Sequence, residues 1–137
     1  MSTMRRSAQL AVFAALAAGA TGAQLSDAAA PIRVTATPPA VARGGRVTIR
    51  GSGWGVIEFC KPRVTLTLRR AAPLAPLAIA TVPLRTAAAT SGTFATTWTV
   101  PLAVHSGLRT IVATQRCESG KNGAVNLVTR TTPLRVR

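Results

Sequence analysis

The sequence predicts an all-β fold, an antiparallel β-sandwich of about seven strands over residues 31–137, preceded by a signal peptide. Apolar and polar residues alternate with period two through almost all of this region, and Val, Ile and Thr are frequent in the alternating stretches. Clusters of Gly, Pro, Ser and Asn separate the stretches, and none has helical periodicity between capping residues. Short strands with this spacing are typical of a sandwich or a barrel, and we favour the sandwich.

The first residues have the pattern of a secretory signal peptide. Arg5 and Arg6 form a basic head, and an apolar run follows at residues 10–20 before a series of small residues. A helix that spans a membrane needs about 18 apolar residues or more, so this run is too short for that role. The small-x-small rule places cleavage after Ala23, with Ala20 as a second candidate.

The mature chain is therefore expected outside the cell. We assign residues 1–23 to the leader, with cleavage possible up to residue 30, and residues 31–137 to one domain, which is long enough for a single sandwich core. We expect no lipid anchor and no transmembrane segment, because neither a cysteine after the leader nor an apolar tail occurs. The expected product is a monomer that is secreted or extracellular. Association with the cell wall is the alternative. General secretion and the twin-arginine route both stay open.

The expected strands in the first half of the domain each have an apolar and a polar face. Residues 46–50 (RVTIR) turn Val47 and Ile49 inward, residues 63–69 (RVTLTLR) repeat the pattern with a Val-Leu-Leu face, and residues 32–36 (IRVTA) alternate similarly. The arginines between the apolar residues are expected to face solvent, and they are Arg33, Arg46, Arg50, Arg63 and Arg69.

Four further strands are expected in the second half of the domain. Residues 93–100 (TFATTWTV) bury Phe94, Trp98 and Val100, and a weaker strand precedes them at residues 77–84. A proline interrupts the alternation of the last strand. The other two strands are expected at residues 108–115 and 125–136.

The two cysteines of the chain, Cys60 and Cys117, are expected to form a disulfide. An even number of cysteines in an exported chain indicates pairing. A bridge across a loop of this length would stabilise the fold by about 4 kcal/mol in the chain-entropy model. The alternative, a metal site, needs more ligands than two separated cysteines and the distant His105 supply. We therefore expect no metal and no cofactor.

The chain is strongly basic, with 17 Lys and Arg residues against 3 Asp and Glu residues and a net charge of +14. Such a balance favours anionic partners, namely wall polymers, lipid head groups, nucleic acid or acidic glycans. The alternative is a genome rich in G and C, which replaces Lys by Arg; only Lys61 and Lys121 are lysines. The arginines would then form a solvated face that also protects the sheet edges. We favour this second interpretation.

Three glycines at alternate positions, Gly51, Gly53 and Gly55, raise the question of a phosphate-binding loop. A dinucleotide-binding loop has the form G-x-G-x-x-G and opens a helix, whereas Val56 replaces the third glycine here and no helix start follows. A P-loop needs Gly-Lys-Ser/Thr, which does not occur at this run. We interpret the run as a corner between two strands, where glycine permits a tight turn and a close backbone approach.

The neighbourhood of the expected disulfide is the candidate binding site. The loops that carry the two cysteines lie at one end of a sandwich, so a bridge brings Glu58 and Glu118 together. Paired carboxylates serve glycoside hydrolysis or cation binding, but a simpler alternative, which we favour, pairs each acid with a nearby cation at the surface. We expect a ligand-binding end with apolar walls and a charged rim. The candidate residues are Trp54, Glu58, Phe59, Lys61, Arg116, Glu118 and Lys121.

Enzymatic activity and nucleic-acid binding have less support. His105 is the single histidine and stands in an expected loop, and the nucleophile motif G-x-S-x-G does not occur, so no catalytic residue is assigned. Stacking of nucleic-acid bases needs exposed aromatic side chains. Phe94 and Trp98 are expected in the core, and the chain has no tyrosine.

The stretch VTATPPAVARGGRVTIRGSGWG at residues 34–55 is similar to the opening of the small Ig-like domains common in secreted and surface proteins of actinobacteria. The similarity continues in order at residues 66–68, 92–101 and 107–110. It implies an Ig-like sandwich, and such domains act as spacers, adhesins and ligand carriers. The chain also resembles, more narrowly, the neocarzinostatin-like apoproteins, Ig-like carriers of an enediyne chromophore that have two disulfides where this chain has cysteines for one.

We therefore expect a secreted, non-enzymatic Ig-like binding or cell-wall-associated module with one disulfide and an unidentified ligand. The first alternative, which the second resemblance implies, is a carrier of a small apolar ligand held between the loops at residues 54–60 and 117–123. The second alternative is the binding of an anionic polymer, a wall polymer or nucleic acid, through the surface arginines.

Overall fold

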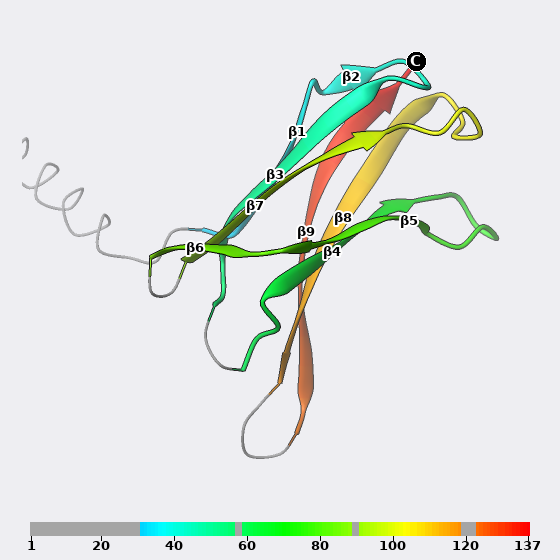
Figure 1. Cartoon of the computed structure of the whole chain (residues 1–137). Coiled ribbons are helices and arrows are strands. Elements are labelled where there is room, and N and C mark those ends of the chain that lie inside the picture. Colours follow the sequence, from blue (N-terminus) through cyan, green and yellow to red (C-terminus); the bar gives the residue numbers. More distant parts are fainter. Residues whose placement is uncertain (1–30, 57–58, 89–90, 119–122) are drawn as a thin grey trace, which may run out of the picture. The chain divides into compact units, whose positions relative to one another are not determined.

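The computed structural model describes residues 31–56, 59–88, 91–118 and 123–137, and these form two packed β-sheets (Figure 1). The described residues contain nine strands and no helix, so the predicted all-β sandwich is confirmed. The described part likewise contains no helix long and apolar enough to span a membrane. Two strands more than expected are present, at residues 40–41 and 85–88.

One sheet has four antiparallel strands in the order β1-β3-β7-β6. The strands are β1 (Arg33–Thr37), β3 (Arg46–Trp54), β7 (Ser91–Thr99) and β6 (Arg85–Ala88).

The other sheet has five strands in the order β2-β9-β8-β4-β5. Its pairs are antiparallel except for β2, which runs parallel to the end of β9. Lettered in chain order, with β2 as a short extra first strand, the two sheets have the ABED and GFC arrangement of an Ig-like sandwich, and β5 extends the second. The strands are β2 (Ala40–Val41), β9 (Val125–Val136), β8 (Gly107–Glu118), β4 (Arg63–Arg69) and β5 (Leu77–Pro83).

The core lies between the sheets and follows the predicted alternation. Ile49 and Leu66 are fully buried, as are the apolar residues two positions away on the inner face of the same strands, Val47, Val64 and Leu68. The five arginines expected in solvent are all exposed. Phe94 is 4% exposed, as expected for a core residue. Trp98 is only half-buried, although it packs against the core.

Two short strands were not expected from the sequence. β2 has two residues and no periodicity of its own, and backbone bonds fix it: the Arg135 amide donates to the Pro39 carbonyl at 2.9 Å and the Arg137 amide donates to the Val41 carbonyl at 2.9 Å. Only Leu84 separates β6 from β5. The Leu84 amide donates to the carbonyl of Pro62, in the connection between β3 and β4, at 2.9 Å. The chain therefore passes from one sheet to the other at this point, and the strand expected at residues 77–84 ends at Pro83.

The glycine run is not the expected corner but part of β3, which continues to Trp54. A β-bulge explains the difference: Gly51 pairs with Phe94 and Trp54 pairs with Gly92, so β3 advances three residues while β7 advances two. Gly53 has a φ of 75°, the left-handed conformation that glycine adopts freely at such a bulge. No helix follows the run among the described residues, as expected from the missing phosphate-loop motif.

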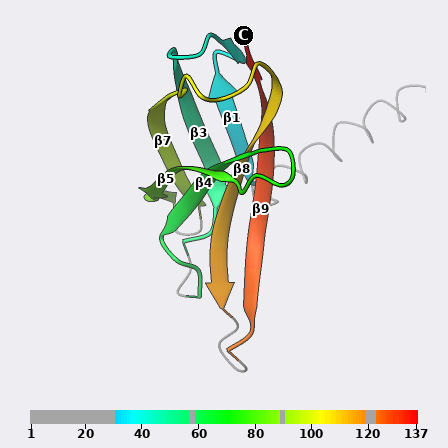
Figure 2. The ribbon, with the colours of Figure 1, turned by 90° about the vertical axis from the view of Figure 1, so that its right-hand side faces the viewer.

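The hairpin of β8 and β9 is the longest element pair of the described domain. All twelve residues of β8 pair with β9, whereas only Thr110 to Thr114 pair with β4. β8 and β9 therefore run side by side past the neighbouring strand (Figures 1 and 2). This extension carries the second cysteine to the disulfide end of the domain.

Candidate functional site at the disulfide end

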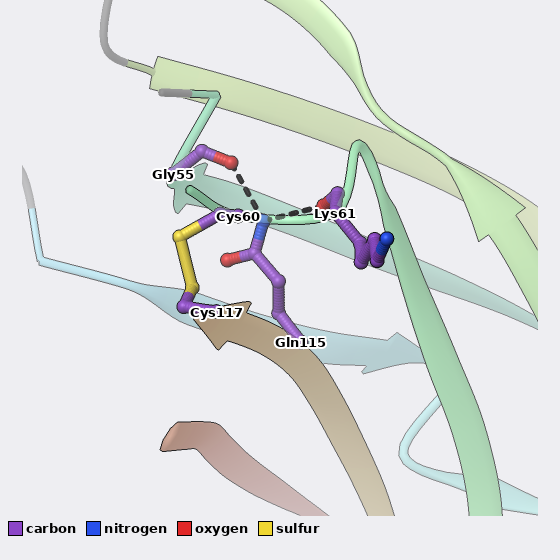
Figure 3. The surroundings of a disulfide bond; sticks show 5 residues. All are labelled: Gly55, Cys60, Lys61, Gln115 and Cys117. Atoms are coloured by element: carbon purple, nitrogen blue, oxygen red, sulfur yellow. Dashed lines mark hydrogen bonds between the residues drawn. A yellow bond between two sulfur atoms is a disulfide. The ribbon is translucent and has the colours of Figure 1, made fainter. Parts of the chain in front are cut away.

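Cys60 and Cys117 form a disulfide, as predicted, with an S–S distance of 2.04 Å. Backbone hydrogen bonds flank the bridge on both sides. The Lys61 amide donates to the Arg116 carbonyl at 2.8 Å, and the Glu118 amide donates to the Phe59 carbonyl at 2.7 Å. The connection between β3 and β4 is therefore attached to the end of β8 (Figure 3).

Gln115 lies beside the disulfide and was not among the candidate residues. Its side chain is 1% exposed, and its Nε2 donates to the carbonyls of Gly55 at 2.6 Å and Lys61 at 2.9 Å (Figure 3). A buried amide that donates to two carbonyls satisfies both and fixes the loop. The sequence held a signal for this role, because Gln115 continues the inward alternation of Ile111 and Ala113 with a polar side chain.

Trp54 is not the wall of a ligand site, and that expectation is wrong. Its side chain is 0% exposed, its ring centroid lies 6.2 Å from that of Phe94, and its Nε1 donates to the Arg33 carbonyl at 3.2 Å. Simple alternation from Val47 and Ile49 would point Trp54 outward. The bulge adds one residue and turns the side chain into the core.

The remaining described candidates do gather at the surface around the disulfide. Phe59 is 47% exposed and Lys61 is exposed. Arg116 and Glu118 form an ion pair, with 3.3 Å between Nε and Oε1, and both side chains are about half exposed. The favoured alternative of a surface ion pair is thus confirmed for Glu118, and such a pair contributes about 0.2–1 kcal/mol.

Glu58 and Lys121 lie outside the described residues, so the paired-carboxylate hypothesis has one described member, Glu118. Nearby, Lys61, Arg63 and Arg116 line a shallow polar hollow of about 250 Å³ on the face of β4 and β8. The described surface at this end is thus cationic and polar, with Phe59 as an exposed apolar side chain.

His105 lies at the other end of β8 from Glu118. It is exposed in the loop before β8, as expected, and its carbonyl accepts from Arg109 Nε at 3.1 Å. The length of β8 separates the two residues by roughly 35 Å, so they form no acid–base pair. A small hollow of about 160 Å³ lies here, lined partly by Leu74 and Val104. Among the described residues, no three His, Cys, Asp or Glu side chains come together.

No family model matches the chain, and no curated protein does. Among solved structures it is similar to neutral ceramidase from Pseudomonas aeruginosa and to a ceramidase complexed with C2, each with 10% identity and a TM-score of 0.49. Each match covers 82% of this chain and 20% or 19% of the other, so the chain spans about a fifth of their length.

Proposed function

We propose that the protein is a secreted, non-catalytic Ig-like module that binds an anionic partner through its basic surface. The sequence alone favoured a merely solvated basic face, but in the described structure the basic side chains are almost uncompensated by acids, and this observation carries the proposal. All Lys and Arg residues except Arg5, Arg6 and Lys121 are in the described part, whereas the only acid there is Glu118, which is paired with Arg116. A surface of this kind attracts polyanions and releases their counterions on binding.

Export is supported by the disulfide and by the sequence of the leader. Disulfides form and persist in oxidising compartments, and Cys60–Cys117 joins distant parts of the domain. The Ig-like order of the strands agrees with the resemblance to Ig-like domains of secreted and surface proteins, and we extend that resemblance to the role of a binding module.

The alternative of a carrier for a small apolar ligand has less support. Trp54, one of its expected walls, is in the core. The apolar hollow beside Leu74 lies at the other end of β8 and has a volume of about 160 Å³, below the roughly 300 Å³ at which ligand pockets begin. The charge distribution therefore favours the anionic partner.

The test uses protein collected from the culture medium of a producing strain. Its mass is expected to correspond to a chain that begins at Gln24 with both cysteines oxidised. This protein is applied to cell walls that retain their anionic polymers and, as a control, to walls from which these polymers have been removed. We expect retention on the intact walls at about 50 mM salt, release at about 500 mM, and little retention on the control.

Two results would contradict the proposal. Equal retention at both salt concentrations would exclude an electrostatic partner, and a chain that stays in the cell with its leader attached would exclude secretion.

A further inference from the structure

A hollow of about 660 Å³ lies on the outer face of the β1-β3-β7-β6 sheet, away from the core. Three arginines from three strands line it: Arg33 of β1, Arg50 of β3 and Arg85 of β6. Its floor between them carries the hydroxyl groups of Thr35, Ser52 and Thr93 and an apolar part made by Gly51, Phe94 and Ala95. This volume is within the range of ligand sites, roughly 300–1,000 Å³.

The pairing of the strands sets the spacing of the three arginines. Arg33 is opposite Ser52 on β3, Arg50 is two residues before Ser52, and Arg85 is opposite Thr93 on β7. From the usual strand separation and rise, the Cα atom of Arg50 lies roughly 8 Å from that of Arg33 and roughly 12 Å from that of Arg85. The three guanidinium groups can therefore contact separate anionic groups of one extended ligand.

The face continues beyond the hollow with the same chemistry. Arg46 is on the same side of β3 as Arg50, and the hydroxyl residues Thr48 and Thr97 lie opposite each other on β3 and β7. The one acidic residue in the described part of the chain, Glu118, is on the other sheet. A long face of guanidinium and hydroxyl groups suits a linear polyanion with its own hydroxyl groups better than a compact ion.

We propose that this face binds a linear polyol-phosphate polymer, a flexible chain of hydroxyl-bearing units joined by phosphodiesters. Arg33, Arg50 and Arg85 each hold one phosphate, since the planar guanidinium donates two parallel hydrogen bonds to phosphate oxygens. The floor hydroxyls of Ser52 and Thr93 bind the polyol. This inference rests on the proposed function and adds the place and the chemistry of the partner.

Two other partners fit the face less well. Base stacking needs an exposed aromatic ring, and Phe94, the aromatic residue at the hollow, is 4% exposed. Insertion into a membrane surface needs exposed apolar side chains. The large apolar residues that are exposed in the described part, among them Leu102 and Leu127, lie outside the strands of this sheet.

The test compares two triple variants of equal net charge. The first, called the groove variant because its three arginines line the hollow described above, is Arg33→Gln, Arg50→Gln and Arg85→Gln. The matched control changes exposed arginines of the other sheet, which line no hollow described above: Arg69→Gln, Arg130→Gln and Arg135→Gln. Binding of a synthetic glycerol-phosphate oligomer is measured by calorimetry over a range of salt concentrations.

We expect the groove variant to bind at least about tenfold more weakly near 150 mM salt and its salt slope to fall by about 2, since each phosphate contact contributes about 0.7 for a flexible chain. The control is expected to lose less than about threefold, since its arginines act only through the long-range field. Replacing the three groove arginines by Lys keeps the charge but removes the paired donors, so it is expected to weaken binding by an intermediate factor.

The outcomes separate this inference from the proposed function. If both triple variants lose affinity equally, the hollow is not the binding site, whereas the proposal of an anionic partner is retained. If a thymidine oligonucleotide or heparin binds as tightly as the glycerol-phosphate oligomer, the chemistry of the polymer is wrong. If the unchanged protein binds none of these polyanions at low salt, the proposed function fails as well. A cooperative thermal unfolding transition in each variant shows that the variants are folded.

Discussion

Gly51 permits the aromatic packing beneath the basic face. A Cβ atom added at this position would lie 1.9 Å from Cε2 of Phe94. The Phe94 ring is 4% exposed and packs beside Trp54, which is itself held by its hydrogen bond to the Arg33 carbonyl. An aromatic ring from the neighbouring strand thus covers the space that glycine leaves open, as is common where glycine interrupts a sheet.

Replacing Gly51 by Ala is therefore expected to lower the free energy of unfolding by about 1–3 kcal/mol, because the Phe94 ring must leave its place in the core. Urea unfolding measures the change. Gly55→Ala is the matched control: its added Cβ would lie 3.4 Å from Cys60 Sγ, so a change below about 1 kcal/mol is expected. Equal losses in the two variants would show that overcrowding at Phe94 is not the cause.

At the scale of elements, the β3–β4 connection is attached to β8 by two different means. The disulfide joins Cys60 to Cys117 across a sequence separation of 57 residues. Gln115 and the backbone bonds of Lys61 act in the folded state alone. The first restricts the unfolded chain, whereas the second satisfies buried carbonyl groups.

Removing the disulfide with Cys60→Ala and Cys117→Ala is expected to lower the free energy of unfolding by about 4 kcal/mol, the chain-entropy value for a loop of this length. The Lys61 amide should nevertheless stay protected from hydrogen exchange under native conditions. Gln115→Met is the comparison: it leaves two carbonyls without a donor, costs about 1–3 kcal/mol per group, and should accelerate exchange at Lys61. The division of roles is refuted if the two variants show the same exchange rate there.

At the scale of the whole molecule, the charge acts on stability as well as on binding. The net charge of the chain is +14, and several of its arginines, among them Arg46, Arg63 and Arg135, alternate with core residues along the strands. Such a distribution places like charges on both outer faces, and their mutual repulsion opposes the compact state. The same surface that attracts a polyanion therefore destabilises the free protein at low ionic strength.

Salt is consequently expected to raise the melting temperature of the free protein while it weakens polyanion binding. Between about 20 mM and about 300 mM sodium chloride, a gain of about 1 kcal/mol would raise the melting temperature by several degrees. Differential scanning calorimetry measures the shift. The Arg69, Arg130 and Arg135 triple variant should respond less, because it has less repulsion to screen. A melting temperature independent of salt would show that repulsion is negligible.

Local pattern was sufficient for much of this domain. The period-two alternation placed most strands, the arginines on their outer faces and residues such as Leu66 in the core. The presence of only two cysteines limited the disulfide to one pairing. These properties depend on neighbours along the chain or on composition, so they can be predicted without knowing which strands pair.

Other features depend on which strands become neighbours. The bulge that turns Trp54 inward exists only in the register between β3 and β7, and β2 is a strand only because β9 lies beside it. The basic hollow likewise needs β1, β3 and β6 to bring Arg33, Arg50 and Arg85 around one floor. Composition alone determined that the domain is basic, but the pairing of distant strands decided where its charges converge, because hydrogen-bonded register is a property of two segments and not of one.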